Sequence, residues 1–379
     1  MRIVPMPESL LRAGQPLPIS LRDGRGGLVV ARGTLLPAGA DVRALLRRAA
    51  WADADEIDSW QRKGRVAHPA RQTSGPRAGD ADAAHWSGLP ARANRVLREP
   101  ADAGFLAALT QLHDELLDRL DHQPDKALMA LIRLASASTD HYSATHGLLC
   151  AAAAALVARQ LPGWSAADCR SASLAALSMN VWMTALQDEL AKQRAVPSVA
   201  QRAVLEHHAH GSAKLLRDAG VDDAHWLEAV EHHHDSVSGP LAPRSKGRQM
   251  ARVLQRVDLF TARLSPRRTR PAMSAAAAAQ AAYQGEDGRP DEAGMLLIRA
   301  LGIYPPGCLV RLATDELGVV LRRGAKANLP QVAVIADSAA RPHALQTCRS
   351  VTEPIKAALA PHELALDLPL GELLSLAQR

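Results

Sequence analysis

The spacing of apolar residues along the chain predicts a mainly α-helical protein. Between residues 100 and 300, apolar side chains recur every three or four positions, which is the period of an α-helix that buries one face. The segments with this period are 105–117, 125–136, 141–160, 165–182, 198–218, 223–233, 248–258, 273–282 and 292–301. We therefore expect a helical bundle as the main body of the protein.

The two ends of the chain show patterns that are typical of β-strands. Near the N-terminus, two short apolar runs flank the turn signal Asp23-Gly-Arg-Gly-Gly, which predicts a β-hairpin, and helical spacing begins at Asp41. After residue 307, the runs 308–312, 317–322 and 331–337 are rich in Val and Leu and are separated by Pro and Gly. These runs favour short strands.

The patterns divide the chain into four predicted parts. Residues 1–61 form an N-terminal β-rich module, and residues 99–307 form the helical domain. Residues 62–98 have no sustained apolar period and are rich in Arg, Gly, Pro and Ser, so we expect a flexible linker there. Residues 308–379 form a small C-terminal β appendage.

Composition limits the classes of partner and the location. Only 3% of the 379 residues are aromatic, and the formal net charge is +6. We attribute this basic excess to solvated Arg-rich faces, and because few rings are present to stack on bases, we expect no DNA or RNA partner. The four cysteines, Cys150, Cys169, Cys308 and Cys348, form no Cys-x-x-Cys pair. Reduced thiols, no signal peptide and no membrane-spanning run predict a cytoplasmic protein.

One stretch carries the residue types of a metal site. Residues 231–240 read Glu-His-His-His-Asp-Ser-Val-Ser-Gly-Pro, and imidazoles and carboxylates are the usual ligands of transition metals. A solvated helix end is the competing interpretation. Metal sites in helical bundles are built from inward side chains on facing helices. The candidate ligands, which come from different predicted helices or helix ends, are His146, His207, His233, His234 and Asp258.

Several motifs resemble the HD-GYP family, bacterial phosphodiesterases of the HD superfamily that act on cyclic dimeric GMP. The histidine matches are His207-x-x-x-Gly211, which is similar to the family's His-Pro-x-x-Gly helix, and His233-His234-Asp235, which is similar to its His-His-Glu run. A register with His232-His233 as the pair stays open. His146 resembles the ligand histidine of the family's first helix.

Further matches extend the resemblance over about residues 140–310. Residues 251–258 look like the helix that ends in the ligand Asp258, and Ser238-Gly239-Pro240 looks like a worn Gly-Tyr-Pro signature. Residues 265–272 are similar to an Arg-Pro-Tyr-Arg-Pro-Ala segment. The resemblance implies that Arg267 and Arg270 lie near substrate phosphates and that the fold is an HD-type helical bundle.

The sequence departs from the family at its defining His-Asp pair. The matching positions hold Met179 and Asn180, and Met183 stands where the family has a lysine. A bridging carboxylate holds two metals together, whereas Asn is neutral and Met is a soft ligand. We therefore expect the two-metal site to be lost. One divalent metal, iron or manganese, remains compatible with His207, His233, His234 and Asp258, and the absence of any metal is the alternative.

These observations lead to one leading function and two alternatives. We expect a degenerate HD-GYP-like protein of cyclic di-GMP signalling, with little or no phosphodiesterase activity, that acts by binding the nucleotide or signalling proteins. The first alternative is an active phosphodiesterase with a rearranged site. The second is a protein-interaction module that binds neither metal nor nucleotide.

Overall fold

The computed structural model describes most of the chain. The described residues are 3–6, 17, 19–34, 51–57, 66–67, 78–236, 238–326, 328–338, 341, 349–351, 353–364 and 366–377. They fall into two compact units, one of residues 1–68 with 363–367 and one of residues 69–362 with 368–379. The helix predicted from Asp41 lies outside the described residues.

The first unit is built on a four-stranded sheet, as the N-terminal pattern predicts. Its strands are β1 (Ile3–Pro5), β2 (Leu21–Arg22), β3 (Leu28–Val30) and β4 (Trp51–Asp53), in the order β1-β4-β2-β3 and all antiparallel. The hairpin β2–β3 turns at Asp23, whose Oδ1 accepts hydrogen bonds from the backbone N–H of Arg25 and of Gly27. The unit also contains the parallel pair β5 (Val66–Ala67) and β11 (Leu366–Asp367).

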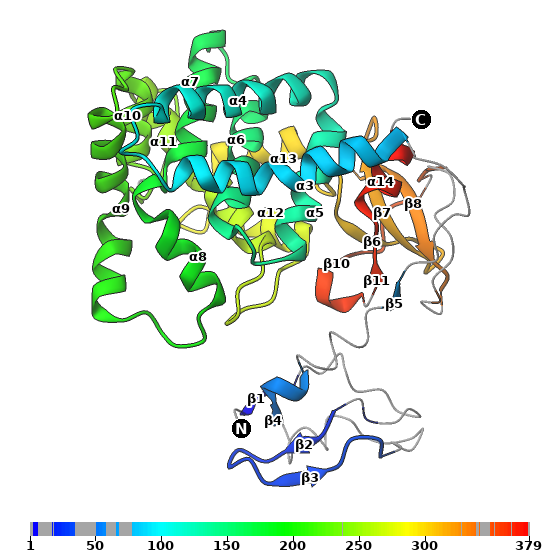
Figure 1. Cartoon of the computed structure of the whole chain (residues 1–379). Coiled ribbons are helices and arrows are strands. Elements are labelled where there is room, and N and C mark those ends of the chain that lie inside the picture. The colour runs from blue at the N-terminus through cyan, green and yellow to red at the C-terminus, as the bar shows by residue number, and fades with distance from the viewer. Residues whose placement is uncertain are drawn as a thin grey trace. The chain divides into compact units, whose positions relative to one another are not determined.

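The second unit is mainly helical, which confirms the predicted fold class (Figure 1). Its helices are α3 (Ala78–Leu97), α4 (Phe105–His122), α5 (Pro124–Ala137), α6 (Tyr142–Ala158), α7 (Ala166–Ser178), η2 (Val181–Met183), α8 (Thr184–Lys192), α9 (Val199–Asp218), α10 (Ala224–Glu231), α11 (Lys246–Leu264), α12 (Ala275–Tyr283), α13 (Glu292–Leu301) and α14 (Leu370–Ala377). Ser165 and Ser198 form capping boxes at the starts of α7 and α9, which satisfy N–H groups that a helix start leaves free.

Helix α6 lies at the centre of the helical unit. Almost every one of its residues is buried, and it packs against α7, α11, α13, α5 and α3. The run Ala151–Ala155 explains this position, because small side chains allow several helices to approach one axis closely. A helix that is apolar on all sides is expected in the middle of a core, and polar residues on it, such as His146, are therefore held inside the protein.

The predicted linker has to be corrected, because residues 78–97 form helix α3. Trp86, Leu89, Ala93 and Leu97 are buried, and their spacing of three and four places them on one face of the helix. Pro90 and the many Ala, Arg and Asp residues hide this stripe in the sequence. The stripe is nevertheless sufficient, because α3 packs against α6 and α14.

The C-terminal strands form a five-stranded antiparallel sheet, as their pattern predicts. The sheet contains β6 (Leu309–Arg311), β7 (Leu317–Arg322), β8 (Gln331–Ala336), β9 (Arg349–Ser350) and β10 (Ala357–Leu359), in the order β10-β6-β7-β8-β9. Strand β7 contacts α5 and α14. The predicted boundary at residue 308 therefore marks a change of secondary structure inside one compact unit.

A buried ion-pair network joins α11 to the start of α13. The guanidinium of Arg252 donates hydrogen bonds to Asp291 at 2.6 and 2.9 Å and to Glu286 at 2.7 and 3.1 Å. Both Arg252 and Asp291 are buried. Partial burial raises the pKa of Glu286, but Arg252 and Arg256 outweigh this effect and lower it to about 2. The carboxylate thus stays charged beside its arginines.

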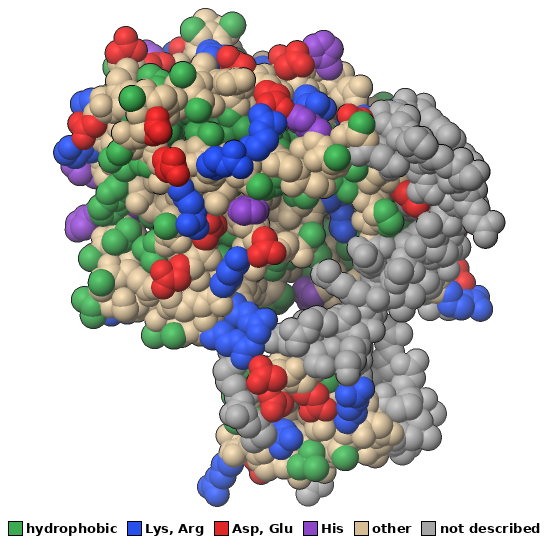
Figure 2. Space-filling view, viewed as in Figure 1, with side chains coloured by type: hydrophobic (Ala, Val, Ile, Leu, Met, Phe, Trp, Pro, Cys, Tyr) green, Lys and Arg blue, Asp and Glu red, His purple; other side chains and the backbone are tan. Residues whose placement is uncertain are grey.

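Charges on the face seen in Figure 2 are mixed in sign. Lys and Arg side chains alternate there with Asp and Glu side chains and form no continuous basic surface over the coloured residues. This arrangement agrees with solvated arginines that pair with carboxylates. Among the described residues, no helix combines the length and the apolar character that crossing a membrane requires.

A buried histidine in α4 makes stability depend on pH. The His113 side chain is fully buried, and burial lowers its pKa from 6.5 to about 4. As the pH falls, the unfolded chain therefore binds this proton before the folded protein does. The free energy of unfolding should fall by about 3 kcal/mol as the pH drops from 6.5 to 4. Above pH 6.5, His113 is neutral in both states and the free energy of unfolding should not depend on it. His113→Leu should flatten the pH dependence of urea midpoints within this window.

The exposed His122 of the same helix provides the control for that measurement. Its pKa is raised by its contact with the Asp118 carbonyl. Protonation of His122 therefore favours the folded state, whereas protonation of His113 opposes it. His122→Gln should therefore keep the loss of stability between pH 6.5 and 4. An unchanged profile in His113→Leu would contradict the assignment to His113.

Candidate metal centre

Three imidazoles from two helices converge inside the helical unit. His208 lies on α9, and His233 and His234 lie in the turn that follows α10. The Nε2 atom of His208 is 3.3 Å from Nε2 of His233 and 3.0 Å from Nε2 of His234. His208 and His233 are buried, and His234 is exposed. The group is thus closed on one side and open to solvent at His234.

Two of these rings are held in the tautomer that a metal requires. Nδ1 of His208 is 2.7 Å from the Leu205 carbonyl oxygen, and Nδ1 of His233 is 2.6 Å from that of Val230. A carbonyl oxygen only accepts, so Nδ1 carries the hydrogen in both rings and Nε2 presents its lone pair. Burial lowers the pKa of His208 and, with His234 beside it, lowers that of His233 to about 3. Both rings are therefore neutral at neutral pH.

The separations between the nitrogens fit a metal ion. Metal–nitrogen bonds of about 2.0–2.1 Å, at angles of about 90–110°, separate two ligand nitrogens by about 2.9–3.4 Å. Both measured separations fall in this range. Two lone pairs that face each other at 3.3 Å repel unless a cation lies between them, so the pair His208–His233 fits a metal better than a hydrogen bond. Carbonyl partners on Nδ1 are also the usual support for metal-bound histidine.

The structure brings His208, and not the predicted candidate His207, to the other two imidazoles. His207 is exposed, whereas His208 is buried on the same face of α9 as Ser212 and Leu216. One residue rotates a side chain by about 100° around a helix axis, so adjacent histidines cannot both face the interior. The four-residue steps from His208 to Ser212 and Leu216 were the available signal. The match of His207 with Gly211 concealed it.

A second group of potential ligands lies between α6 and α11. His146 Nε2 is 2.8 Å from Asp258 Oδ1 and 3.5 Å from the sulfur of Cys150. Burial raises the pKa of Asp258, but His146 and the imidazoles of His233 and His234 outweigh it and hold the pKa below its usual range. Helix α11, which carries Asp258, packs against α10, and His233 and His234 follow α10 in the chain. Sequence analysis predicted His146 and Asp258 but missed Cys150, although Cys150 lies one helical turn after His146.

A ring stack connects the predicted phosphate-binding segment to this second group. The Arg267 guanidinium lies over the Tyr142 ring, 5.2 Å from its centroid, and its Nε donates to the Tyr142 hydroxyl at 3.1 Å. Tyr142 in turn stacks on His146 with 6.0 Å between ring centroids. Arg270 pairs its backbone with that of Arg267. Its Nη2 donates to the Ala262 carbonyl, and its buried Nε has no partner among the described residues.

Comparison with known proteins supports the family resemblance. No protein-family model matches the chain. Over 235 residues, the chain is 27% identical to the cyclic di-GMP phosphodiesterase PA4108 of Pseudomonas aeruginosa, a match that covers 60% of this chain and 55% of that protein. The chain therefore spans about half the length of this curated relative. Over this aligned part, the chain is similar to a cyclic di-GMP phosphodiesterase.

One solved structure also aligns with this chain. It is Bd1817, an HDG"Y"P protein from Bdellovibrio bacteriovorus, with a TM-score of 0.38 and 13% sequence identity. The alignment covers 78% of this chain and 98% of that chain.

Met179 and Asn180, which stand at the positions matched to the family's His-Asp pair, are buried at the end of α7. Met179 and Asn180 lie between α7 and η2, and Met183 ends η2. Oδ1 of Asn180 is buried and has no hydrogen-bond partner among the described residues. The next turn runs along α9, because the backbone N–H of Trp182 donates to the Ser212 hydroxyl at 3.2 Å. The segment that holds the substituted residues therefore packs against α9, the helix that carries His208.

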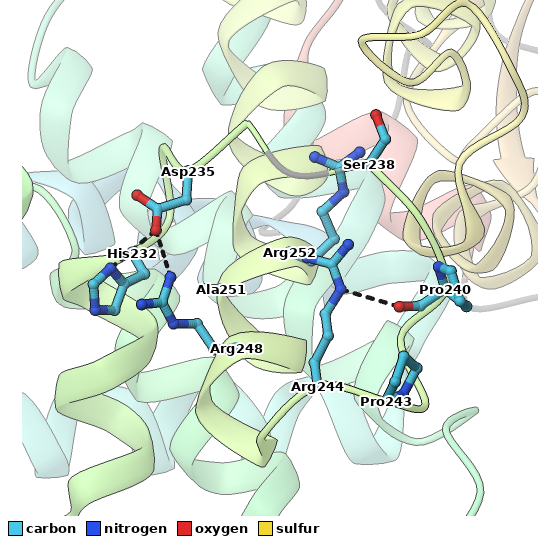
Figure 3. A pocket seen from close by; sticks show the side chains of 9 residues that line it. All are labelled: His232, Asp235, Ser238, Pro240, Pro243, Arg244, Arg248, Ala251 and Arg252. Carbon is cyan, nitrogen blue, oxygen red and sulfur yellow. Dashed lines mark hydrogen bonds and ion pairs between the residues drawn. The ribbon is translucent and has the colours of Figure 1, made fainter.

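The loop that contains Ser238, Gly239 and Pro240 borders a cavity of the helical unit. This cavity of about 380 Å³ is lined by residues that include His232, Ser238, Pro240 and Arg252. Figure 3 shows that Asp235 pairs with both His232 and Arg248. His232 therefore pairs with Asp235, whereas His233 and His234 lie beside His208.

Proposed function

We propose that this chain binds cyclic di-GMP beside a single divalent metal and has little or no phosphodiesterase activity. In this proposal, the protein acts in bacterial cyclic di-GMP signalling as a nucleotide-binding or partner-binding protein. The observation that carries it is the convergence of three Nε2 atoms in a chain that holds Met179 and Asn180 at the positions of the family's His-Asp pair, because it combines a usable metal site with the loss of the family's bridging ligands.

The metal part of the proposal rests on His208, His233 and His234. Their nitrogens have the separations of metal ligands, and two of the rings are fixed by backbone carbonyls. Asp258 supplies a negative charge close by. A divalent metal bound there would polarise a phosphate oxygen, which is the chemistry that such ions supply to phosphodiesters.

The nucleotide part rests on the arginine segment. The stack of Arg267 on Tyr142 and of Tyr142 on His146 brings a guanidinium to the same side of α6 as the candidate ligands. Guanidinium groups recognise phosphate oxygens through charge-assisted hydrogen bonds. A phosphodiester that contacts Arg267 would thus lie near the metal centre. The curated relative of this chain, PA4108, is a cyclic di-GMP phosphodiesterase, which supports this choice of nucleotide.

The proposed loss of hydrolysis rests on the three substituted positions. Asn180 is neutral and cannot replace a carboxylate that bridges two dications. Met179 offers only a thioether, which suits soft metals, and Met183 provides no charge for a phosphate. A second hard divalent ion therefore lacks two of its ligands.

Metal content and turnover together test this function. We expect the purified protein to retain about one equivalent of metal and the wild type to show negligible cyclic di-GMP hydrolysis. The double variant Met179→His with Asn180→Asp should raise the retained metal toward two equivalents, with modest or no gain in turnover. Two equivalents of iron or manganese in an active wild type would overturn the proposal.

Nucleotide binding provides the next prediction. Arg267→Ala should weaken cyclic di-GMP binding about 10- to 100-fold in calorimetry, because a hydrogen bond to a charged group contributes about 1.5–3 kcal/mol. Arg268→Ala removes a neighbouring exposed arginine and should leave the affinity within about twofold. Equal effects of both variants would indicate a general charge effect, and no heat with the wild type would refute nucleotide binding.

A further inference from the structure

We infer that the side chain of Trp182 is a stacking surface for a base of the bound nucleotide. This role rests on the proposed function, because it assumes that the chain binds cyclic di-GMP. It extends that function, since it assigns the base to a residue outside both the arginine segment and the candidate metal ligands. The contacts of Trp182 with α9 and its exposure to solvent carry the inference.

Trp182 is the aromatic member of the exposed large apolar side chains that the structure describes, with an exposed fraction of 41%. Other described tryptophans are covered to a greater extent: Trp86 and Trp226 are buried, and Trp51 and Trp164 are half-buried. An indole offers a large, rigid apolar surface that favours contact over solvent. The exposed indole of Trp182 is therefore suited to cover a flat, aromatic ligand.

The indole lies face-on against Gly211 of α9. A methyl group at Gly211 would be 2.7 Å from Cε3 and 2.8 Å from Cγ of Trp182, and closer still to Cδ2. Because Cδ2 is bonded to both of these atoms and is nearer than either, Gly211 lies above the ring plane and not at its edge. Glycine allows this close approach, since it has no Cβ. One face of the indole is thus covered by α9, and the other face is left for a ligand.

Two contacts place this indole beside the turn of α9 that carries His208. Gly211 and Ser212 follow His208 by three and four residues, and side chains with these spacings are neighbours on a helix. The indole covers Gly211, and the backbone N–H of Trp182 donates to the buried Ser212 hydroxyl at 3.2 Å. Trp182 therefore lies about one helical turn, or about 5.4 Å along the axis, from a candidate metal ligand.

This position suits a nucleotide whose phosphate lies at the metal centre. The ribose separates the base of a nucleotide from its phosphate by a distance comparable to one helical turn. Stacking on an aromatic ring stabilises a bound base and tolerates any base, because every base has a π face. Trp182 would thus supply affinity without distinguishing guanine from adenine. A single ring is sufficient for one base, so the low aromatic content of the chain does not oppose this role.

Calorimetry with cyclic di-GMP on the full-length, metal-loaded protein tests this role. Trp182→Leu keeps an apolar side chain but removes the ring, so it should weaken binding about 5- to 100-fold. Trp182→Phe keeps a ring and should bind within about threefold of the wild type. Both variants should retain metal as the wild type does, because they leave His208 unchanged, and circular dichroism checks that both are folded.

Fluorescence adds a readout that a purely structural role would not change. A base stacked on an indole quenches its emission, so cyclic di-GMP should lower the tryptophan emission of the wild type. Trp182→Phe should lose this decrease while it still binds the nucleotide. The control is Trp164→Phe, which changes a half-buried tryptophan whose Nε1 donates to Gln249 at 3.2 Å and should keep the decrease.

The possible outcomes separate this inference from the proposed function. Equal affinities of the wild type and Trp182→Leu, or quenching that survives in Trp182→Phe, would refute the stacking role and leave nucleotide binding standing. If Trp182→Leu lost its metal together with its affinity, Trp182 would act through His208 and the stacking role would be wrong. Absence of binding to the wild type would refute the proposed nucleotide function and the inference together.

Discussion

His208→Ala is expected to lower the metal affinity of this protein at least about 100-fold, because the loss of a supporting partner alone costs about 10- to 100-fold and this variant removes a ligand. His208 is the nitrogen shared by both close contacts of the group, at 3.3 Å to His233 and 3.0 Å to His234. Its removal leaves two ligands without their common neighbour. Metal retained after dialysis against a chelator, measured by elemental analysis, is the readout.

The neighbouring His207 supplies a control with the same chemistry. Its side chain is exposed and is rotated by about 100° around α9 from that of His208, so His207→Ala should retain metal as the wild type does. The two variants remove the same atoms from adjacent positions, and any general effect on α9 or on surface metal binding would appear in both. Loss of metal in His207→Ala with retention in His208→Ala would reverse our assignment.

Arg252→Leu is expected to destabilise the helical unit by about 3–5 kcal/mol, which is the usual cost of removing one partner of a buried ion pair. Among the ion pairs of the described residues, the variant leaves the buried Asp291 with the 3.5 Å contact from Arg256. Asp291 also caps α13 by accepting a hydrogen bond from the Gly294 N–H at 2.9 Å. Urea unfolding followed by circular dichroism measures the effect, because helices dominate that signal.

Arg248 lies one turn earlier on α11 and distinguishes burial from charge. It pairs with Asp235 and Glu228 in a partly exposed position, so Arg248→Leu should cost less than about 1 kcal/mol. The double variant Arg252→Leu with Asp291→Leu should recover part of the loss, since it leaves no unpaired buried charge. Similar losses for Arg252→Leu and Arg248→Leu would show that the buried network contributes no special stability.

The sequence by itself determined the helical class and most helix positions, and it predicted the residue types of the candidate metal site. Apolar periodicity and capping residues are local properties, and they placed α9 and α13 close to their observed bounds. The substitutions Met179 and Asn180 were also visible, because they interrupt a motif of fixed spacing. The weak apolar stripe of α3 was missed, because Pro90 and polar residues interrupt its pattern. This face is stabilised by packing against α6 and α14, which the local sequence does not reveal.

Only the tertiary structure decided which side chains share the site. Whether His207 or His208 turns inward depends on the rotation of α9 about its axis, and a motif cannot give that rotation when adjacent residues are both histidines. His146 meets Asp258 across 112 residues of sequence, and this meeting brings Cys150 into the same group. Arg267 reaches the site through Tyr142. Such contacts depend on how distant helices pack, which local sequence patterns do not encode.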